Sequence, residues 1–230
     1  MLLLCAAVAG RPHPFNYTDY VLWQRAKTDR VTRTGQQWVL EETVAAIADY
    51  VRGALPCNRS FALAHGVRSG RETVWLRARL PGVQVWGTEL SPVAAATAPW
   101  TVPWDFHAAR PEWRGAADFV YSNALDHAFN ATLALETWLG QLAPGGAVLM
   151  HWAGSARPST GLHQHTDIFY ASHDGLMRTL CAVGAVVRVL ALPRPRFNWI
   201  GDKARKQTVY VLRPRAVAPT SLCAARRRGA

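Results

Sequence analysis

Short apolar runs alternate with segments of helical pattern from residue 61 onwards, and this order constrains the fold more than any other feature. The expected strands are 61–65, 83–90, a short run that ends at Asp105, 117–122 and 147–152. Helical patterns lie between them at 69–80, 91–98 and 130–142, and an amphipathic stretch at 41–55 comes first. Continuous apolar strands that helices separate predict a parallel sheet with both faces covered.

The carboxy-terminal part has a different pattern. A helix is expected near 174–183, and the apolar runs 186–192 and 207–212 follow it on either side of a basic loop. These runs predict two strands that close one edge of the sheet as an antiparallel pair. An open α/β sheet binds its ligand outside the carboxyl ends of its strands, so the residues directly after the first four strands are the candidate site.

Composition supports one globular domain with a sizeable core. Half of the 230 residues are hydrophobic, ten are Trp and only 18% are charged, which excludes a disordered or fibrous chain. No apolar run approaches the roughly 18 residues that a membrane-spanning helix needs. The apolar stretch Met1–Gly10 is either a truncated signal or a start without one, so a cytoplasmic and a secretory location both stay open.

Four cysteines lie far apart without a C-x-x-C pair, which argues against a structural zinc site and a disulfide-rich scaffold. Histidines gather at 151, 163, 165 and 173, but no second anchoring pair accompanies them, and we predict no metal site. N-x-S/T triplets begin at Asn16, Asn58 and Asn130 and give only weak support for secretion. Asn130 has a competing role as the N-cap of the expected helix 130–142.

Positive charge is concentrated near the carboxy terminus. The formal net charge is +11, yet from Arg188 onwards eleven Lys and Arg residues face only Asp202, so the remainder is almost neutral. Any footprint for a polyanion would therefore belong to the carboxy-terminal part. The alternative is a solvated basic edge followed by a disordered tail at 214–230.

A glycine-containing loop, His65-Gly66-Val67-Arg68-Ser69-Gly70, follows the first expected strand and leads into a helix. Without Cβ atoms, backbone amides at a helix start can approach a ligand closely. Nineteen residues after Gly70, the second strand ends in Glu89, where an acidic side chain can accept hydrogen bonds from both hydroxyls of a ribose. Together these features indicate a cofactor that contains a nucleoside.

Three further motifs follow in order: Asp105-Phe106 after the third strand, the stretch from Asp118 to Asp126-His127 around the fourth, and Leu142-Ala-Pro-Gly-Gly before the fifth. With them the sequence resembles the class I S-adenosylmethionine-dependent methyltransferases of the small-molecule type over about residues 58–213. The resemblance implies a Rossmann-like, doubly wound, mostly parallel seven-stranded sheet with an antiparallel last strand. It also implies methyl transfer from S-adenosyl-L-methionine to an unidentified small-molecule acceptor.

The resemblance assigns roles to particular residues. The loop that contains His65, Gly66 and Gly70 would cradle the methionine and ribose, and Glu89 would bind the ribose hydroxyls. Asp105 would accept from the adenine amino group while Phe106 packs on the ring. Ser122 and Asn123 would line the methionine side. Asp126 and His127 would face the methyl group and the acceptor, with His127 as candidate general base.

The sequence also departs from the pattern of this family. Ala64 stands where an acidic residue is expected at the end of the first strand, and Arg68 replaces the middle glycine of the loop. Ser122-Asn123-Ala124-Leu125 replaces the N-P-P-Y type motif of enzymes that methylate amino groups of nucleic acids. Ala64 and Arg68 leave open a catalytically silent binding module, and the positive charge of the carboxy-terminal part leaves open an enzyme that acts on nucleic acid.

Overall fold

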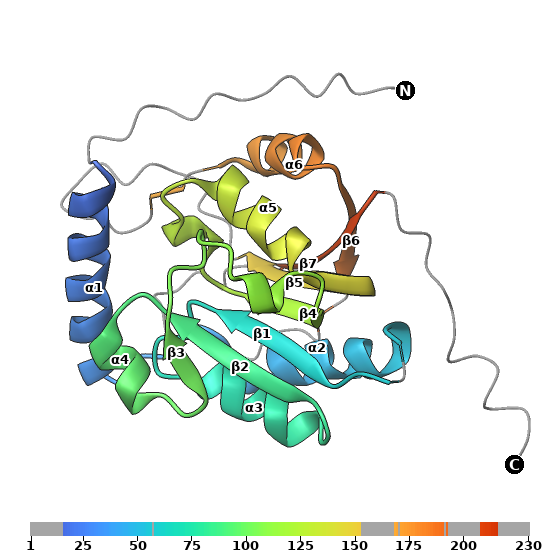
Figure 1. The fold of residues 1–230 in the computed structure, drawn as a ribbon, viewed down its shortest axis with the longest axis horizontal. Helices are drawn as coiled ribbons and strands as arrows, with labels where there is room; N and C mark the ends of the chain where they lie inside the picture. Colours follow the sequence, from blue (N-terminus) through green and yellow to red (C-terminus); the bar gives the residue numbers. More distant parts are fainter. Residues whose placement is uncertain are drawn as a thin grey trace, which may run out of the picture.

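The computed structural model describes residues 16–56, 58–152, 168–169, 171–190, 192 and 208–215. Its strands are β1 Phe61–His65, β2 Gln84–Glu89, β3 Thr101–Pro103, β4 Ala117–Ser122, β5 Leu142–Trp152, β6 Ala185–Leu190 and β7 Thr208–Pro214. They form a seven-stranded sheet in the order β3-β2-β1-β4-β5-β7-β6 (Figure 1). Pairing is parallel from β3 to β5, and β7 is antiparallel to both of its neighbours, which confirms the predicted fold class.

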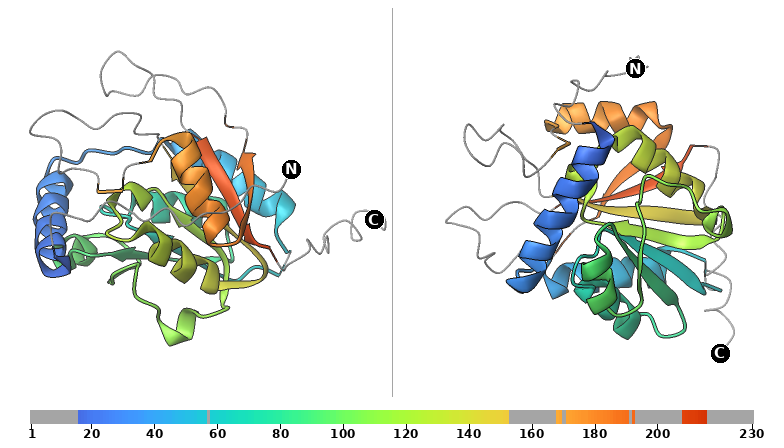
Figure 2. Two further views of the ribbon diagram at one scale, coloured as in Figure 1. Left: turned by 90° about the horizontal axis from the view of Figure 1, so that it is seen from above. Right: turned by 60° about the vertical axis from the view of Figure 1, so that its left-hand side comes forward.

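Helices cover both faces of this sheet (Figure 2). The helices are α1 Tyr17–Arg33, α2 Glu41–Ala54, α3 Arg71–Arg79, α4 Pro92–Thr97, α5 Ala131–Gly140 and α6 His173–Ala182, with short 3-10 turns at Pro111–Trp113 and Leu125–His127. One core lies under α2 and α3, and the other lies under α5 and α6. Two hydrophobic cores on opposite faces explain why the central strands β1, β4 and β5 are apolar at most positions.

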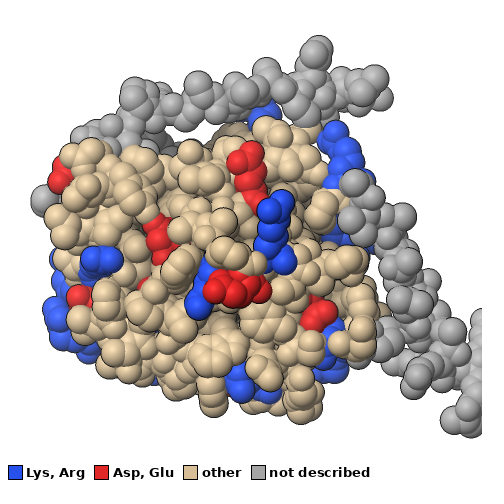
Figure 3. All heavy atoms as spheres, viewed as in Figure 1, with Lys and Arg blue, Asp and Glu red and all other residues tan. Residues whose placement is uncertain are grey.

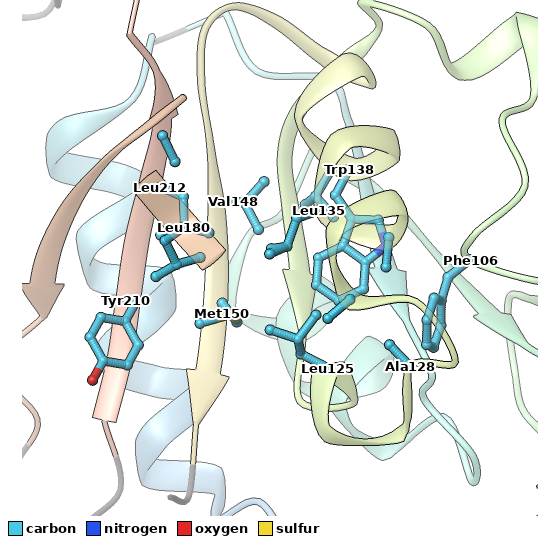
Figure 4. Close-up of a cluster of buried hydrophobic side chains, with 14 of the residues drawn as sticks. Phe106, Leu125, Ala128, Leu135, Trp138, Val148, Met150, Leu180, Tyr210 and Leu212 are labelled. Atoms are coloured by element: carbon cyan, nitrogen blue, oxygen red, sulfur yellow. The ribbon is translucent and has the colours of Figure 1, made fainter. Parts of the chain in front are cut away.

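Alternate side chains of β5 enter opposite cores, as the period of a strand requires. Val148 and Met150 pack on the α5–α6 side, where Figure 4 shows them beside Leu135 and Trp138, whereas Leu149 lies in the other core. Trp138 is fully buried and anchors α5 on the sheet. This frame holds the carboxyl ends of the parallel strands at one edge, where the candidate site lies.

The Pro-Gly-Gly segment differs from the prediction. We expected a turn at 144–146 before a strand at 147–152, but β5 already begins at Leu142, and its register against β4 shifts between Ala117 and Phe119. Gly145 has φ +81°, and a Cβ on Gly146 would come within 2.9 Å of the carbonyl oxygen of Asp118. The segment is therefore an irregularity within the strand, which only glycine can form at this spacing.

Helix α1 stands beside α4 at the edge of the molecule in Figure 1. It begins at Asn16, whose side chain accepts from the backbone N–H of Asp19 as an N-cap. Asn130 caps α5 in the same way, as predicted. On the face in Figure 3, basic and acidic side chains are interspersed over a largely uncharged surface. None of the described helices is long and apolar enough to cross a membrane.

Candidate functional site

A cavity lies between α1 and the segments that follow β1, β2, β3 and β4. Five residues that the sequence predicted line it, namely Gly66, Glu89, Asp105, Phe106 and His127. They come from four different strand ends, and parallel pairing brings these ends to one edge of the sheet. The sequence-based position of the site is thus the position of a cavity in the structure.

Glu89 ends β2 and is 5% exposed. One carboxylate oxygen accepts from the backbone N–H of Arg68 at 2.9 Å, and the other accepts from the backbone N–H of Ser91 at 3.2 Å. Burial raises the pKa of Glu89, and these two amides, together with the charge of Arg68, oppose that rise. The carboxylate is fixed in orientation, and each oxygen keeps a lone pair with which it can accept from a hydroxyl group.

At Gly66 the loop after β1 closely approaches the segments that follow β3 and β4. It has φ +69°, and a Cβ there would lie 2.4 Å from the Cβ of Ala124 and 3.7 Å from the ring of Phe106. Only glycine avoids this clash and adopts this backbone conformation without strain. The missing side chain therefore lets the loop, the turn after β4 and the aromatic ring meet at the cavity wall.

Arg68, which replaces a glycine of the family pattern, also lines the cavity. Its φ of +47° is in the left-handed region, which costs a residue with a Cβ about 1–2 kcal/mol. One guanidinium nitrogen donates to the carbonyl oxygen of Gln36 at 3.3 Å. Burial lowers the pKa of Arg68, whereas the nearby carboxylates of Glu72, Glu89 and Asp126 favour its charged form. The side chain thus brings a cation into a site that is rich in carboxylates.

Asp105 and Phe106 follow β3, the strand that pairs with β2, and line the same cavity as Glu89. Phe106 is 8% exposed, and its ring packs edge-on against Trp138 with centroids 5.5 Å apart. Asp105 accepts from the ring of His107 at 2.6 Å. His107 was not predicted as a site residue, because a single histidine two positions after an aspartate carries no recognisable spacing signal.

Five predicted residues do not line the cavity, namely Asp126 in the turn after β4 and the four residues His65, Gly70, Ser122 and Asn123. The side chain of His65 is 1% exposed, bonds Thr88 and Gln141, and has a pKa lowered to about 4 by burial. Gly70, with φ +74°, packs against the end of α4. Ser122 donates its hydroxyl to the carbonyl oxygen of His65, which ties the ends of β1 and β4 together. Asn123 is half-buried and does not line the cavity.

Asp126 and His127 form the turn after β4, and α1 covers them. His127 Nδ1 lies 3.2 Å from Lys27 Nζ, and its Nε2 lies 3.9 Å from a carboxylate oxygen of Asp126. An ammonium group can only donate, so the imidazole of this state carries its proton on Nε2 and offers Nδ1 to Lys27. Burial raises the pKa of Asp126 to about 6, and the charge of Lys27 opposes this rise.

Polar contacts hold α1 over the site. The Tyr20 hydroxyl and the Gln24 amide both donate to the carbonyl oxygen of His127, at 2.9 and 3.3 Å. Arg25 donates to the carbonyl oxygen of Leu90 at 3.1 Å. Under this cover the cavity has a volume of about 50 Å³. Pockets for drug-sized ligands are usually about 300–1,000 Å³, so the cavity as described is smaller than such a ligand needs.

The α1 residues of the site are not among those predicted from the sequence. Asn16 begins a glycosylation triplet, but Asn16 and Asp19 also have the spacing of a helix N-cap. That signal would have predicted a helix over 17–33, but not that its residues Tyr20, Gln24 and Lys27 face the strand ends. The histidines at 163 and 165 lie outside the described residues.

Several known structures share the fold of this chain. A 1,6-didemethyltoxoflavin-N1-methyltransferase from Burkholderia thailandensis, solved with bound 1,6-didemethyltoxoflavin and S-adenosylhomocysteine, matches with a TM-score of 0.64. It is 16% identical to this chain, and the match covers 89% of this chain and 93% of that one.

Two further structures extend the comparison. A chain from the complex of the Haloferax volcanii Trm112 methyltransferase activator with a methyltransferase described as putative matches with TM-score 0.61 and 18% identity, over 86% of this chain and 98% of that one. The [4+2]-cyclase SpnF matches with TM-score 0.50 and 19% identity, over 64% of this chain and 59% of that one. No protein-family model and no curated protein matches the sequence. The structural likeness shows that this chain has the fold of the class I S-adenosylmethionine-dependent methyltransferases.

Proposed function

We propose that the protein transfers a methyl group from S-adenosyl-L-methionine to a small-molecule acceptor. The observation that carries this proposal is the buried carboxylate of Glu89, which two backbone amides hold at the end of β2 between the Gly66 loop and the Asp105-Phe106 segment. A rigid pair of acceptor oxygens at this position suits the two hydroxyls of a ribose. The bound S-adenosylhomocysteine in a protein of the same fold supports the same cofactor class.

The described residues fit such a cofactor chemically. Phe106 would pack on the base and Asp105 would accept from its amino group, while Gly66 leaves the space that a Cβ would fill. Arg68 and Lys27 would provide positive charge for the carboxylate of the methionine part. The cavity of about 50 Å³ is too small for a nucleoside, so cofactor entry would require α1 to move away from the strand ends.

When it is bound, the cofactor supplies an electrophilic methyl group on a sulfonium. Methyl transfer is an in-line displacement, and the protein would contribute chiefly by aligning the acceptor, an effect that can be worth about 7–11 kcal/mol. His127 would take a proton from a hydroxyl or acid acceptor. Since Nδ1 contacts Lys27 Nζ at 3.2 Å, His127 could act through this nitrogen only after that contact opens.

A catalytically silent binding module is the second candidate. Arg68 in place of a glycine and the small volume of the cavity favour it. The structural neighbour SpnF is described as a [4+2]-cyclase, and a fold by itself does not define a reaction. Of the basic residues that motivate a nucleic-acid substrate, the structure describes only Arg188, Arg213 and Arg215, and no observation on the described residues favours that alternative.

Calorimetric titration with S-adenosylmethionine and S-adenosylhomocysteine tests the proposal. Glu89→Ala should weaken both affinities about tenfold or more, because a hydrogen bond to a charged group is worth roughly 1.5–3 kcal/mol. The matched control is Glu42→Ala on the exposed surface of α2, which should bind like the wild type. Unchanged affinity in the Glu89 variant would overturn the cofactor assignment. Binding without turnover of any acceptor in a metabolite screen would favour the silent module.

A further inference from the structure

His107 makes an unusually complete set of contacts for a residue beside a cavity. It is 6% exposed, and both its backbone N–H and its ring Nδ1 approach the same oxygen of Asp105, Oδ1, at 2.9 and 2.6 Å. Its Nε2 accepts from the backbone N–H of Asn130 at 3.3 Å. A neutral imidazole has one proton, so an accepting Nε2 means that Nδ1 carries it and donates to Asp105.

The two bonds leave the oxygens of Asp105 unequal. Every hydrogen bond that the described residues make to this carboxylate ends on Oδ1. Oδ2 is therefore the oxygen that remains for a ligand in the cavity, which Asp105 lines. A carboxylate held through one oxygen cannot rotate to share its charge between alternative partners, so the direction of the other oxygen is set.

Neighbouring elements keep the His107 ring in place. Its carbonyl oxygen accepts from the Thr137 hydroxyl at 3.1 Å, and Asn130 begins α5, so this helix holds the residue at two points. The ring also lies beside Phe106, with centroids 4.6 Å apart, and edge-on to Tyr20 of α1 at 6.1 Å. These contacts make the orientation of Asp105 a consequence of the frame of the sheet and α5.

We propose that His107 is a positioning residue that makes the site select a purine base with a 6-amino group over one with a 6-oxo group. This inference rests on the proposed function and deepens it. Held through Oδ1, Asp105 presents Oδ2 as an acceptor, which suits an amino group that donates. A 6-oxo base would place a second acceptor against Oδ2 of Asp105. A site built for one hydrogen-bonding pattern rejects an analogue that lacks the matching donor.

The test compares the affinities for S-adenosylhomocysteine and its 6-oxo analogue S-inosylhomocysteine by calorimetry. The wild type should prefer the amino form by about 100-fold or more. His107→Phe keeps a ring but removes both nitrogens, and it should reduce this preference about tenfold. His107→Asn is the matched control, because its amide can still donate to Asp105 from near the position of Nδ1; it should retain most of the preference.

Each result decides a specific point. If His107→Phe weakens both ligands equally and leaves their ratio unchanged, His107 is only structural and the inference is wrong. Equal wild-type affinity for both ligands would overturn the inference and leave the proposed function standing, whereas failure to bind either would overturn both. If His107→Phe does not fold, Asp105→Asn replaces it: an amide can donate to a 6-oxo group, so the preference should narrow or reverse, and an unchanged ratio would contradict the inference.

Discussion

The two ends of the cavity are built in different ways. At the Asp105 end, hydrogen bonds from the loop and α5 hold the buried His107, and α1 adds a ring contact from Tyr20. At the His127 end, the contacts come from Lys27, Tyr20 and Gln24 of α1, and the side chain of His127 is 23% exposed. Under the proposed function, recognition of the base would depend mainly on the sheet and α5, whereas the His127 end would be complete only with α1 in place (Figure 1).

Electrostatics follow the same division. The Asp105 carboxylate receives two hydrogen bonds from one neighbour within the loop. The positive charge of Lys27 on α1 lowers the pKa of Asp126. Burial has the larger effect and raises this pKa to about 6. A carboxylate that is costly to ionise in the folded protein is frequent at functional sites, where stability is exchanged for reactivity.

The largest effect is expected at Gly66, where the two ends meet. Gly66→Ala should lower cofactor affinity about 100-fold or more, because the new Cβ would collide with Ala124, and overpacking costs about 1–3 kcal/mol on top of backbone strain. Gly115→Ala is a matched control: its φ of +66° is nearly the same, but no atom lies within 4 Å of the added Cβ. Equal loss of affinity in both variants, measured by calorimetry, would show that the close approach at Gly66 is irrelevant.

His127→Ala should separate the reacting end from the recognition end. We expect turnover to fall about 100-fold if His127 is the general base, with little change in cofactor affinity. Asp105→Ala should do the opposite and weaken cofactor binding first. The assay follows S-adenosylhomocysteine release with an acceptor found by screening hydroxyl, carboxyl and amine metabolites. Wild-type turnover in the His127 variant at every pH would assign this residue a structural role.

The smallest effect concerns stability at Asp126. The pKa of Asp126 is about 6 in the folded protein, above the ordinary value of 3.8. The favourable contribution of the protonated group to the free energy of unfolding is therefore complete at low pH and is lost as the pH rises from about 4 through 6. Asp126→Asn should therefore raise the free energy of unfolding at pH 7 by about 1–2 kcal/mol, a value reduced for partial exposure, and change little at pH 4.

Asp105→Asn is the comparison for Asp126→Asn, because it weakens charge-assisted bonds at the other end. It should lower the free energy of unfolding at pH 7 by about 1 kcal/mol. Denaturant titrations at pH 4 and pH 7 give both values. A loss of stability of the same size in both Asn variants at pH 7 would contradict the proposed difference between the two ends.

The periodicity and order of the apolar runs predicted the sheet and the edge of the sheet at which the structure has a cavity. The central strands are largely apolar, and the polar residues at or just beyond the ends of β2, β3 and β4 must meet at one edge once pairing is parallel. The α1 residues could not be predicted in this way, because the docking of an amino-terminal helix depends on contacts such as Tyr20 to His127 that no local pattern encodes. His65 is a residue that the sequence placed in the site by its position alone. It directly precedes the loop, but its side chain points into the core and stacks on Trp138.

The position of β7 between β5 and β6 affects how the chain can fold during synthesis. Val148 of β5 pairs with Leu212, so the hydrogen-bonding edge of β5 has no partner in this sheet until the ribosome has made the residues up to 214. At about 5–20 residues per second, that interval lasts several seconds. During this time an apolar strand edge is open to other chains. A nascent chain of this topology therefore depends more on rapid completion or on a chaperone than does a chain whose last strand is added at the outer edge of the sheet.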